Sequence, residues 1–237
     1  MPGVPPKDSG LRMNLVVAFL AKDEAGPDRY LRRCLQNAKQ WADKIVVLDD
    51  RSSDQTAQVC RDEGAEVTIR TSLEHAWGRE ADARKELWEL AARAAEDGWI
   101  LFQDCDMELS ADPRPLCETD SLNTWAWSLV DLWNSEDQHR VDGYWQGSKI
   151  NRPWLVCPSR VPTGWIAEWP IRGIHCGHLP SNWPARAGHA PKEFFWRHLA
   201  YLTHEHRVAK HGQYIAQSGQ LTEWERAHAD SILDGDT

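Results

Sequence analysis

The stretch ILFQDCDMEL, residues 100–109, begins as an apolar run and then places three acidic residues within five positions: Asp104, Asp106 and Glu108. Carboxylates this close repel one another, so the arrangement is unfavourable unless water, a cation or a basic group lies among them. We expect a buried strand that ends in a polar ligand site, with Cys105 pointing into the core by strand alternation. Glu108 is expected in a loop, apart from the ligands.

The residues before this stretch alternate between apolar runs and helical patterns. Strands are predicted at 15–21, 44–50, 65–70 and 98–103, and helices at 30–41, 54–64 and 79–96. Strands and helices that alternate at this length predict right-handed crossovers and a parallel sheet covered on both faces. The predicted fold class is therefore α/β, with a central, mainly parallel sheet.

After about residue 120 the pattern becomes mixed and rich in loops. Strands are predicted at 123–133 and 153–160, a hairpin at 139–147 and a helix at 203–217. Nine of the 14 tryptophans lie between 125 and 196, and most are expected to fill volume, with one or two of Trp145, Trp165, Trp169 and Trp183 lining an acceptor groove. We expect a tail at 1–10, one domain over 11–237 with halves at 11–119 and 120–217, and a C-terminal tail at 218–237.

The composition is that of an ordinary globular protein of 237 residues, with 41% hydrophobic and 27% charged residues. No apolar run reaches the roughly 18 residues of a membrane span, and the N-terminal ten residues lack the apolar core of a signal peptide. The six cysteines include no CxxC pair, so neither a zinc site nor a disulfide framework is indicated. These features favour the cytoplasm.

The charge is distributed unevenly along the chain. The net charge of −9 argues against a protein that coats nucleic acid. The segment from Arg140 to Lys210, however, contains ten Lys or Arg residues and only four Asp or Glu residues, and six of the ten histidines also lie there. The second half is therefore basic, which suggests an acceptor that carries negative charge.

Acidic residues follow three of the predicted parallel strands: Asp23 and Glu24, then Asp49 and Asp50, then Asp104 and Asp106. In such sheets, ligands bind beyond the carboxyl ends of the strands, so we expect a shared polar site. Neither GxGxxG nor GxxxxGK[ST] is present to bind phosphates. An Asp-x-Asp pair that holds Mn²⁺ or Mg²⁺ would neutralise a diphosphate instead.

The first half of the chain resembles a known family. VVAFLAKDEAGPDRYLRRCLQNAKQWADKIVVLDDRSSDQTAQVCRDEGAEV (16–67), GREADARKELWELA (78–91) and DGWILFQDCD (97–106) resemble the opening of family-2 glycosyltransferases of the GT-A fold. The resemblance covers about 13–110 and suggests a small bacterial or phage-type member. Arg51 and Gln55 stand where the family's GSTDGT motif has glycines, and Lys85 stands in place of an asparagine.

The resemblance implies a role for each matching residue. Asp23, Asp49 and Asp50 would contact the base and ribose of a nucleotide-sugar donor, most commonly a UDP-sugar. Arg84, and with it Lys85, would reach the nucleotide or its phosphates. Asp104 and Asp106 would hold the ribose and the metal-bound diphosphate.

The second half resembles the family less closely. RGIHCGHLP (172–180) and RHLAYLTHEHRVAKHGQY (197–214) are similar to segments in which a histidine lies near the acceptor side. The resemblance implies His198 as a third metal ligand, with His175 and His178 as competitors. Arg207 and Lys210, one helical turn apart, face either phosphate or solvent.

Inverting sugar transfer needs a carboxylate base on the acceptor side, and Glu168, Asp142 and Asp131 are the candidates. The expected acceptor is a glycan or lipid, with or without phosphate, or DNA with a hydroxymethylated base. A nucleotidyltransferase and a non-catalytic nucleotide-sugar-binding module remain alternatives. The segment KDEAGPD (22–28) does not provide the Gly-rich basic loop of a nucleotidyltransferase.

Overall fold

The structure, a computed structural model, describes residues 13–72, 80–170, 176–216, 219 and 221–234. The tail predicted at 1–10 lies outside these residues. The strands are β1 (Leu15–Ala21), β2 (Lys44–Asp49), β3 (Glu66–Ile69), β4 (Trp99–Phe102), β5 (Met107–Leu109), β6 (Thr124–Trp133), β7 (Ser135–His139), β8 (Arg152–Val156), β9 (Ala187–His189) and β10 (Phe195–His198). The α-helices are α1 (Leu31–Ala38), α2 (Thr56–Asp62), α3 (Glu80–Ala95), α4 (His204–Ala216) and α5 (Glu223–Asp230). Short 3-10 helices are η2 (Arg114–Glu118), η3 (Gly147–Lys149), η4 (Pro158–Arg160) and η6 (Ser231–Leu233).

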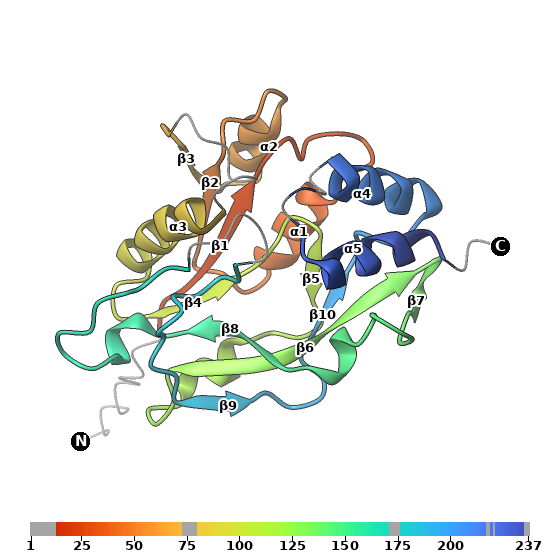
Figure 1. The fold of residues 1–237 in the computed structure, drawn as a ribbon. Coiled ribbons are helices and arrows are strands. Elements are labelled where there is room, and N and C mark those ends of the chain that lie inside the picture. The colour runs from red at the N-terminus through yellow and green to blue at the C-terminus, as the bar shows by residue number, and fades with distance from the viewer. Residues whose placement is uncertain (1–12, 73–79, 171–175, 217–218, 220, 235–237) are drawn as a thin grey trace, which may run out of the picture.

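One mixed sheet runs through the described part of the chain in the order β3-β2-β1-β4-β8-β6-β10-β5, with β7 and β9 added on β6 (Figure 1). Strands β3, β2, β1 and β4 are parallel, and β8 is antiparallel to both β4 and β6. The predicted α/β class, with a parallel half followed by a mixed half, is confirmed. Among the described residues, no helix is long and apolar enough to cross a membrane.

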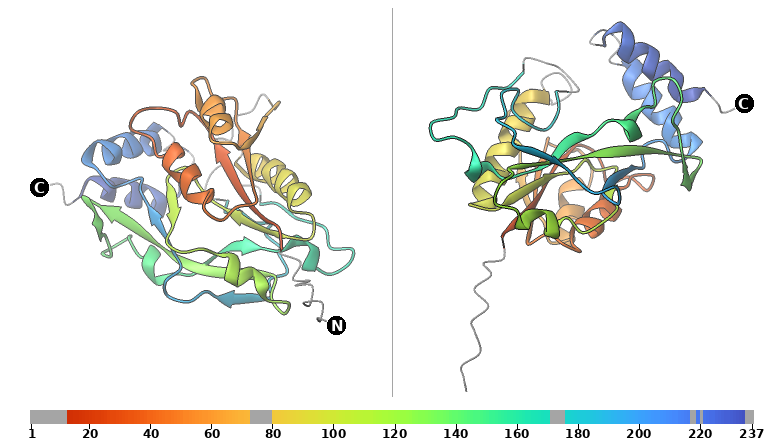
Figure 2. Two further views of the ribbon diagram at one scale, coloured as in Figure 1. Left: turned by 180° about the vertical axis from the view of Figure 1, so that it is seen from behind. Right: turned by 90° about the horizontal axis from the view of Figure 1, so that it is seen from below.

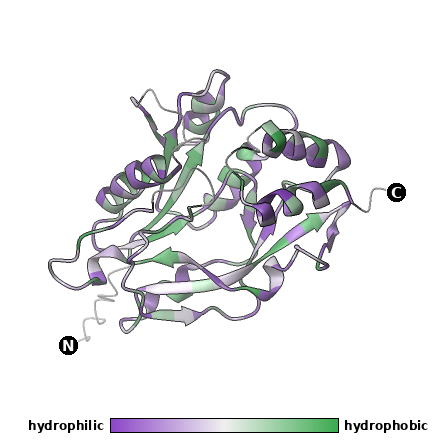
Figure 3. Ribbon diagram, viewed as in Figure 1, coloured by the Kyte–Doolittle hydropathy of each residue, from purple (hydrophilic) through white to green (hydrophobic). Residues whose placement is uncertain are grey.

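Helices cover both faces of the parallel strands. In β1, Leu15, Val17 and Phe19 are buried with α1 on one face, and alternate residues Val16 and Ala18 are buried with α3 on the other. Figure 2 shows α3 on the opposite side of the sheet from α1 and α2, and Figure 3 shows the apolar central strands between helices that are polar outside. Burial on both faces explains why these strands read as continuous apolar runs.

The acidic residues of 100–109 lie in and around a tight turn between β4 and β5. Gln103 is fully buried and donates from its Nε2 to the Met107 carbonyl at 2.7 Å, which closes the turn. Cys105 is buried, as predicted, and its Sγ donates to the Leu20 carbonyl at 3.4 Å, but it lies in the turn, so strand alternation is not the cause. The prediction of a loop at Glu108 is wrong, because this residue belongs to β5 and both of its oxygens are held by Arg33 at 2.7 Å.

Two further predictions in the second half are wrong. The hairpin expected at 139–147 is made instead by β6 and β7, which reverse at Asn134 with a φ of 63°. The segment expected as a tail, 218–237, contains α5 and η6 within its described residues. A capping box between Thr222 and Glu225 starts α5, and Ile232 of η6 is fully buried, so packing holds this segment to the domain.

Candidate functional site

Asp104 and Asp106 each meet their own basic partners. Arg84 on α3 approaches Asp104 with its Nη2 at 3.0 Å from Oδ1. Lys210 on α4 approaches Asp106 with its Nζ at 3.3 Å from Oδ2. Basic groups therefore relieve the carboxylate repulsion expected from the sequence. Burial alone would raise the pKa of Asp106, but Lys210 and then His198 hold that pKa well below its usual range.

His198 is held between two carboxylates. Its Nδ1 lies 2.7 Å from Asp131 Oδ1 at the end of the sheet, and its Nε2 points at Asp106 Oδ2 at 3.5 Å. Burial opposes a charge on the ring, yet Asp106 and Asp131 raise the pKa of His198 to about 9. The predicted metal ligand is thus brought to Asp106, whereas Asp131, a candidate base, is engaged in orienting the imidazole.

His178 occupies the other side of the acidic turn. Its Nε2 lies 3.7 Å from Asp104 Oδ2, and its ring stacks on Phe102 at a centroid distance of 6.0 Å. Burial, followed by the charge of Arg84, lowers the pKa of His178 to about 4, so the ring is neutral near pH 7. Its buried Nδ1 has no hydrogen-bond partner among the described residues. The other competitor, His175, lies outside the described residues.

The acids that follow β1 and β2 hold two loops together. Asp23 adopts a φ of 52°, donates its backbone N–H to Ser52 Oγ at 2.9 Å, and accepts from the Ser53 N–H at 2.6 Å. Asp49 accepts from the Ser52 N–H at 2.7 Å. The positive φ of Arg51, 56°, explains why a glycine suits this position in the family motif.

Asp50 is fully buried, and its Oδ1 lies 3.1 Å from Nη1 of Arg70, a residue that directly follows β3. Arg70 is a contact that the sequence reasoning missed, although an arginine directly after a parallel strand is the available signal. The roles of Asp23, Asp49 and Asp50 as nucleotide contacts stay predictions. Their carboxylates have structural partners here.

A polar cavity of about 220 Å³ lies beside Asp106, between the loop after β1 and helix α4. Its lining includes Glu24, Tyr30, Asp106, His206 and Lys210. Helix α4 is docked there by His206, whose Nδ1 lies 2.8 Å from Tyr30 Oη. Burial raises the pKa of Glu24 to about 7. The cavity therefore combines carboxylates, a lysine and a phenol at the carboxyl end of the parallel strands.

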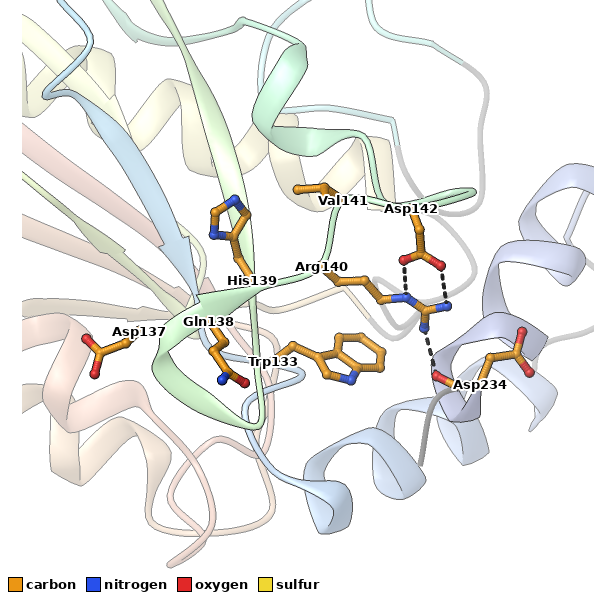
Figure 4. A pocket seen from close by; sticks show the side chains of 8 residues that line it. All are labelled: Trp133, Asp137, Gln138, His139, Arg140, Val141, Asp142 and Asp234. Atoms are coloured by element: carbon orange, nitrogen blue, oxygen red, sulfur yellow. Dashed lines mark hydrogen bonds and ion pairs between the residues drawn. The ribbon is translucent and has the colours of Figure 1, made fainter. Parts of the chain in front are cut away.

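The other two candidate bases, Asp142 and Glu168, do not line this cavity. Asp142 follows β7, is 66% exposed, and pairs with Arg140 at 2.6 Å. It lines a different, open groove of about 630 Å³ (Figure 4). Glu168 is exposed in the stretch after η4, and His178, which approaches Asp104, lies ten positions further along the chain. The backbone of Glu168 is fixed by Asn182 and Ser181, at 3.0 and 2.8 Å, while the side chain faces solvent.

The donor set beside the cavity suits a hard divalent cation. Asp106 supplies carboxylate oxygen, and His198 supplies an imidazole nitrogen that Asp131 orients from behind, as carboxylates commonly do for metal-binding histidines. Within the described ranges, no group of three or more His, Cys, Asp or Glu residues stands ready to hold a metal. Mg²⁺ and Mn²⁺ commonly complete a small protein ligand set with phosphate oxygens and water, so the residues present fit a cation shared with a phosphorylated substrate.

Comparisons with known proteins give partial likenesses. No family model matches the chain. A TPR repeat-containing protein of Synechococcus elongatus is 32% identical over 93 residues, which are 39% of this chain and 20% of that protein. The chain therefore spans about a fifth of the length of this curated relative.

Solved structures show a similar partial match. A crystal structure of glucosyl-3-phosphoglycerate synthase from Mycobacterium tuberculosis with Mn²⁺, uridine diphosphate and glucosyl-3-phosphoglycerate is 20% identical, covers 51% of this chain and 44% of its own, and has a TM-score of 0.36. A crystal structure of a mycobacterial protein is 19% identical, with coverage of 50% and 42% and a TM-score of 0.38. At this level of similarity, neither match identifies a substrate or an activity for this chain. The site therefore has to be interpreted from its own residues.

Proposed function

We propose that this protein is a metal-dependent glycosyltransferase that moves a sugar from a nucleotide-diphosphate sugar to an acceptor hydroxyl. One observation carries the proposal. Asp106 lies at the ligand-binding edge of the sheet, beside a cavity, with His198 aimed at it by Asp131. This arrangement suits a site for a cation and a diphosphate.

The chain's own cations support diphosphate binding. Arg84 and Lys210 come from opposite sides of the acidic turn, and each pairs with a carboxylate of that turn. A diphosphate that enters between them offers the same cations phosphate oxygens of higher charge, while a bound cation balances the acids. Bound Mn²⁺ or Mg²⁺ would supply Lewis-acid stabilisation of the departing nucleoside diphosphate. The resemblance of residues 13–110 to family-2 enzymes favours a UDP-sugar as the donor.

The proposed acceptor side is that of Glu168. Transfer with inversion needs a carboxylate there, and Glu168 remains the predicted base, ten residues before His178, which reaches Asp104. Among the described residues, no side chain pairs with the exposed carboxylate of Glu168. An acceptor hydroxyl activated by this residue would attack the anomeric carbon from the face opposite the diphosphate.

Donor turnover tests the proposal. Purified protein is incubated with a panel of UDP-, GDP-, ADP- and TDP-sugars, with Mn²⁺, with Mg²⁺ or with a chelator, and release of the nucleoside diphosphate is measured. We expect metal-dependent hydrolysis of at least one donor, abolished in Asp106→Ala and unchanged in Asp120→Asn, whose carboxylate is fully exposed. Metal-independent hydrolysis, or full activity in Asp106→Ala, would contradict the proposal.

Two other outcomes separate the alternatives. Donor binding without turnover in the presence of any acceptor would identify a nucleotide-sugar-binding module. Turnover that appears only with DNA containing hydroxymethylated bases would identify a DNA glycosyltransferase. The anomeric configuration of the product, read by proton NMR, decides whether transfer inverts, and loss of transfer in Glu168→Gln with retained donor hydrolysis would support this residue as the base.

A further inference from the structure

The open groove that contains Asp142 lies apart from the acidic turn and has no role in the proposed transfer. It has a volume of about 630 Å³ and runs between β7 and the last described residue, Asp234 (Figure 4). Trp133 forms its floor, and Asp137, Gln138 and His139 of β7 line one side. The groove is thus a polar trough over one aromatic ring.

Arg140 organises the groove but offers no free charge to a ligand. Its Nε and Nη2 bind Asp142 at 2.6 and 3.2 Å, and its Nη1 donates to the carbonyls of Ser231 and Asp234 at 2.7 and 3.0 Å. Its guanidinium also lies 4.7 Å from the centroid of the Trp133 ring. The groove therefore presents carboxylates, an amide and an imidazole, with an excess of negative charge that disfavours phosphates, nucleic acid and anionic membranes.

An aromatic platform lies near the groove, with Tyr144 on the loop after Asp142 and two rings on α5, which Trp145 joins to Arg140. It consists of Tyr144, Trp224 and His228, and Tyr144 lies two residues beyond Asp142. Trp224 is 59% exposed and Tyr144 is 38% exposed, with their rings 5.6 Å apart at 77°. One face of Trp224 is stacked on His228 at 5.5 Å and 16°. Exposed tryptophan and tyrosine side by side commonly mark a binding surface.

We propose that the groove and the aromatic platform together bind a neutral glycan chain. Sugar rings have apolar C–H faces that lie on aromatic rings, and hydroxyls that donate to carboxylates and amides, and the two features supply these two kinds of partner side by side. The rings of Trp224 and Tyr144 are nearly perpendicular, and together they would contact one sugar ring. Asp137 and Gln138 accept hydroxyl hydrogen bonds from neighbouring units in the groove.

The groove is also connected to the acidic site. Arg140 donates its backbone N–H to the Asp131 carbonyl at 3.1 Å, and Asp131 is the residue that orients His198. Tyr201 contacts both regions, since its ring stacks on Trp133 at 5.9 Å and meets His198 edge-on at 5.1 Å. These contacts join the groove to the acidic site through buried residues, and glycan binding in the groove does not depend on the proposed transfer.

Saturation-transfer NMR and tryptophan fluorescence with cellohexaose, maltohexaose, chitohexaose and mannohexaose test the proposal. We expect the full chain to bind at least one of these, and Trp224→Ala to weaken that binding by about tenfold or more, as loss of a stacking ring does. Asp137→Asn should weaken it less. Ile166→Ala, which removes an 80% exposed apolar side chain elsewhere, is the matched control and should bind as the wild type does.

Several results would overturn the proposal: no binding of any hexasaccharide, equal binding by Trp224→Ala, preferential binding of hexalysine, or a dimer that dissociates on Trp224→Ala in light scattering. Donor hydrolysis is measured on the same samples. If hydrolysis is present but glycan binding is absent, the glycan surface fails and the proposed function stands. If glycan binding is present but hydrolysis is absent, the proposed function fails and the glycan surface stands.

Discussion

Replacing Lys210 by methionine tests whether this lysine and a divalent cation compete for the carboxylate of Asp106 in the proposed site. Lys210 Nζ lies 3.3 Å from Asp106 Oδ2, and the two side chains are only 24% and 23% exposed. At an effective dielectric constant of about 20, their attraction is about 5 kcal/mol. Part of this offsets the desolvation of both charges, so we expect Lys210→Met to lower the free energy of unfolding by about 2 to 3 kcal/mol.

The same substitution should strengthen the binding of a cation at Asp106. Without Lys210, the carboxylate of Asp106 has one competitor fewer, so Mn²⁺ should stabilise the variant more than it stabilises the wild type. Unfolding is followed by circular dichroism in urea and by thermal melts, with and without Mn²⁺. In the melts, a loss of this size corresponds to a shift of roughly 5 to 10 °C, part of which Mn²⁺ should restore.

The control for this experiment is Lys149→Met, because Lys149 has no acidic partner within 4.0 Å among the described residues. This variant should unfold within about 0.5 kcal/mol of the wild type and respond to Mn²⁺ equally. If Lys210→Met is no less stable than Lys149→Met, or if Mn²⁺ stabilises it less than the wild type, the interpretation of the Asp106 contact is refuted.

Three further outcomes follow from single contacts. Arg33 and Arg197 lower the pKa of Glu136 from 4.5 to about 2. The two ion pairs of Glu136 therefore stabilise the fold fully above pH 4.5, and this stabilisation is lost as the pH falls toward 2. Glu136→Gln should therefore cost under about 1 kcal/mol in urea unfolding at pH 7, because the carboxylate is half exposed, and less still at pH 3. Gly98→Ala should destabilise by more than about 3 kcal/mol in the same assay, since a Cβ would lie 2.1 Å from the Asn14 carbonyl oxygen; a wild-type midpoint would contradict the strand register. Gly212→Ala, with nothing within 4 Å of its Cβ on α4, should instead stabilise by about 0.5 to 1 kcal/mol, and a loss of stability would count against that helix.

Strands β1, β2 and β4 of the parallel half are predictable because they are buried on both faces, whereas β3 at the edge of the sheet is largely exposed. The predicted runs at 15–21 and 44–50 match β1 and β2 to within one residue at each end. The later segments lack this signal. A register shift between Leu132 and Trp133 and the reversal at Asn134 displace the hairpin from its expected place. Helix α5 was predictable from its capping box, since threonine at 222 and glutamate at 225 are visible in the sequence.

The candidate site was predictable in its residue types but not in their pairing. The carboxyl ends of parallel strands meet at one edge of the sheet, so Asp104 and Asp106 could be placed in a polar site at that edge. Their partners Arg84, Lys210 and His198 come from 20 to 104 positions away, and only the fold decides which base meets which acid. The same reasoning explains the error at Glu108, whose strand is fixed by Arg33 on a helix far back in the chain.

Isothermal titration calorimetry of UDP binding tests the central claim most directly. We expect UDP to bind the wild-type chain only with Mn²⁺ or Mg²⁺, and Asp106→Asn to weaken this binding by at least about tenfold while Asp120→Asn leaves it unchanged. Metal-independent binding of UDP that survives Asp106→Asn would contradict the claim that this carboxylate holds a cation and a diphosphate.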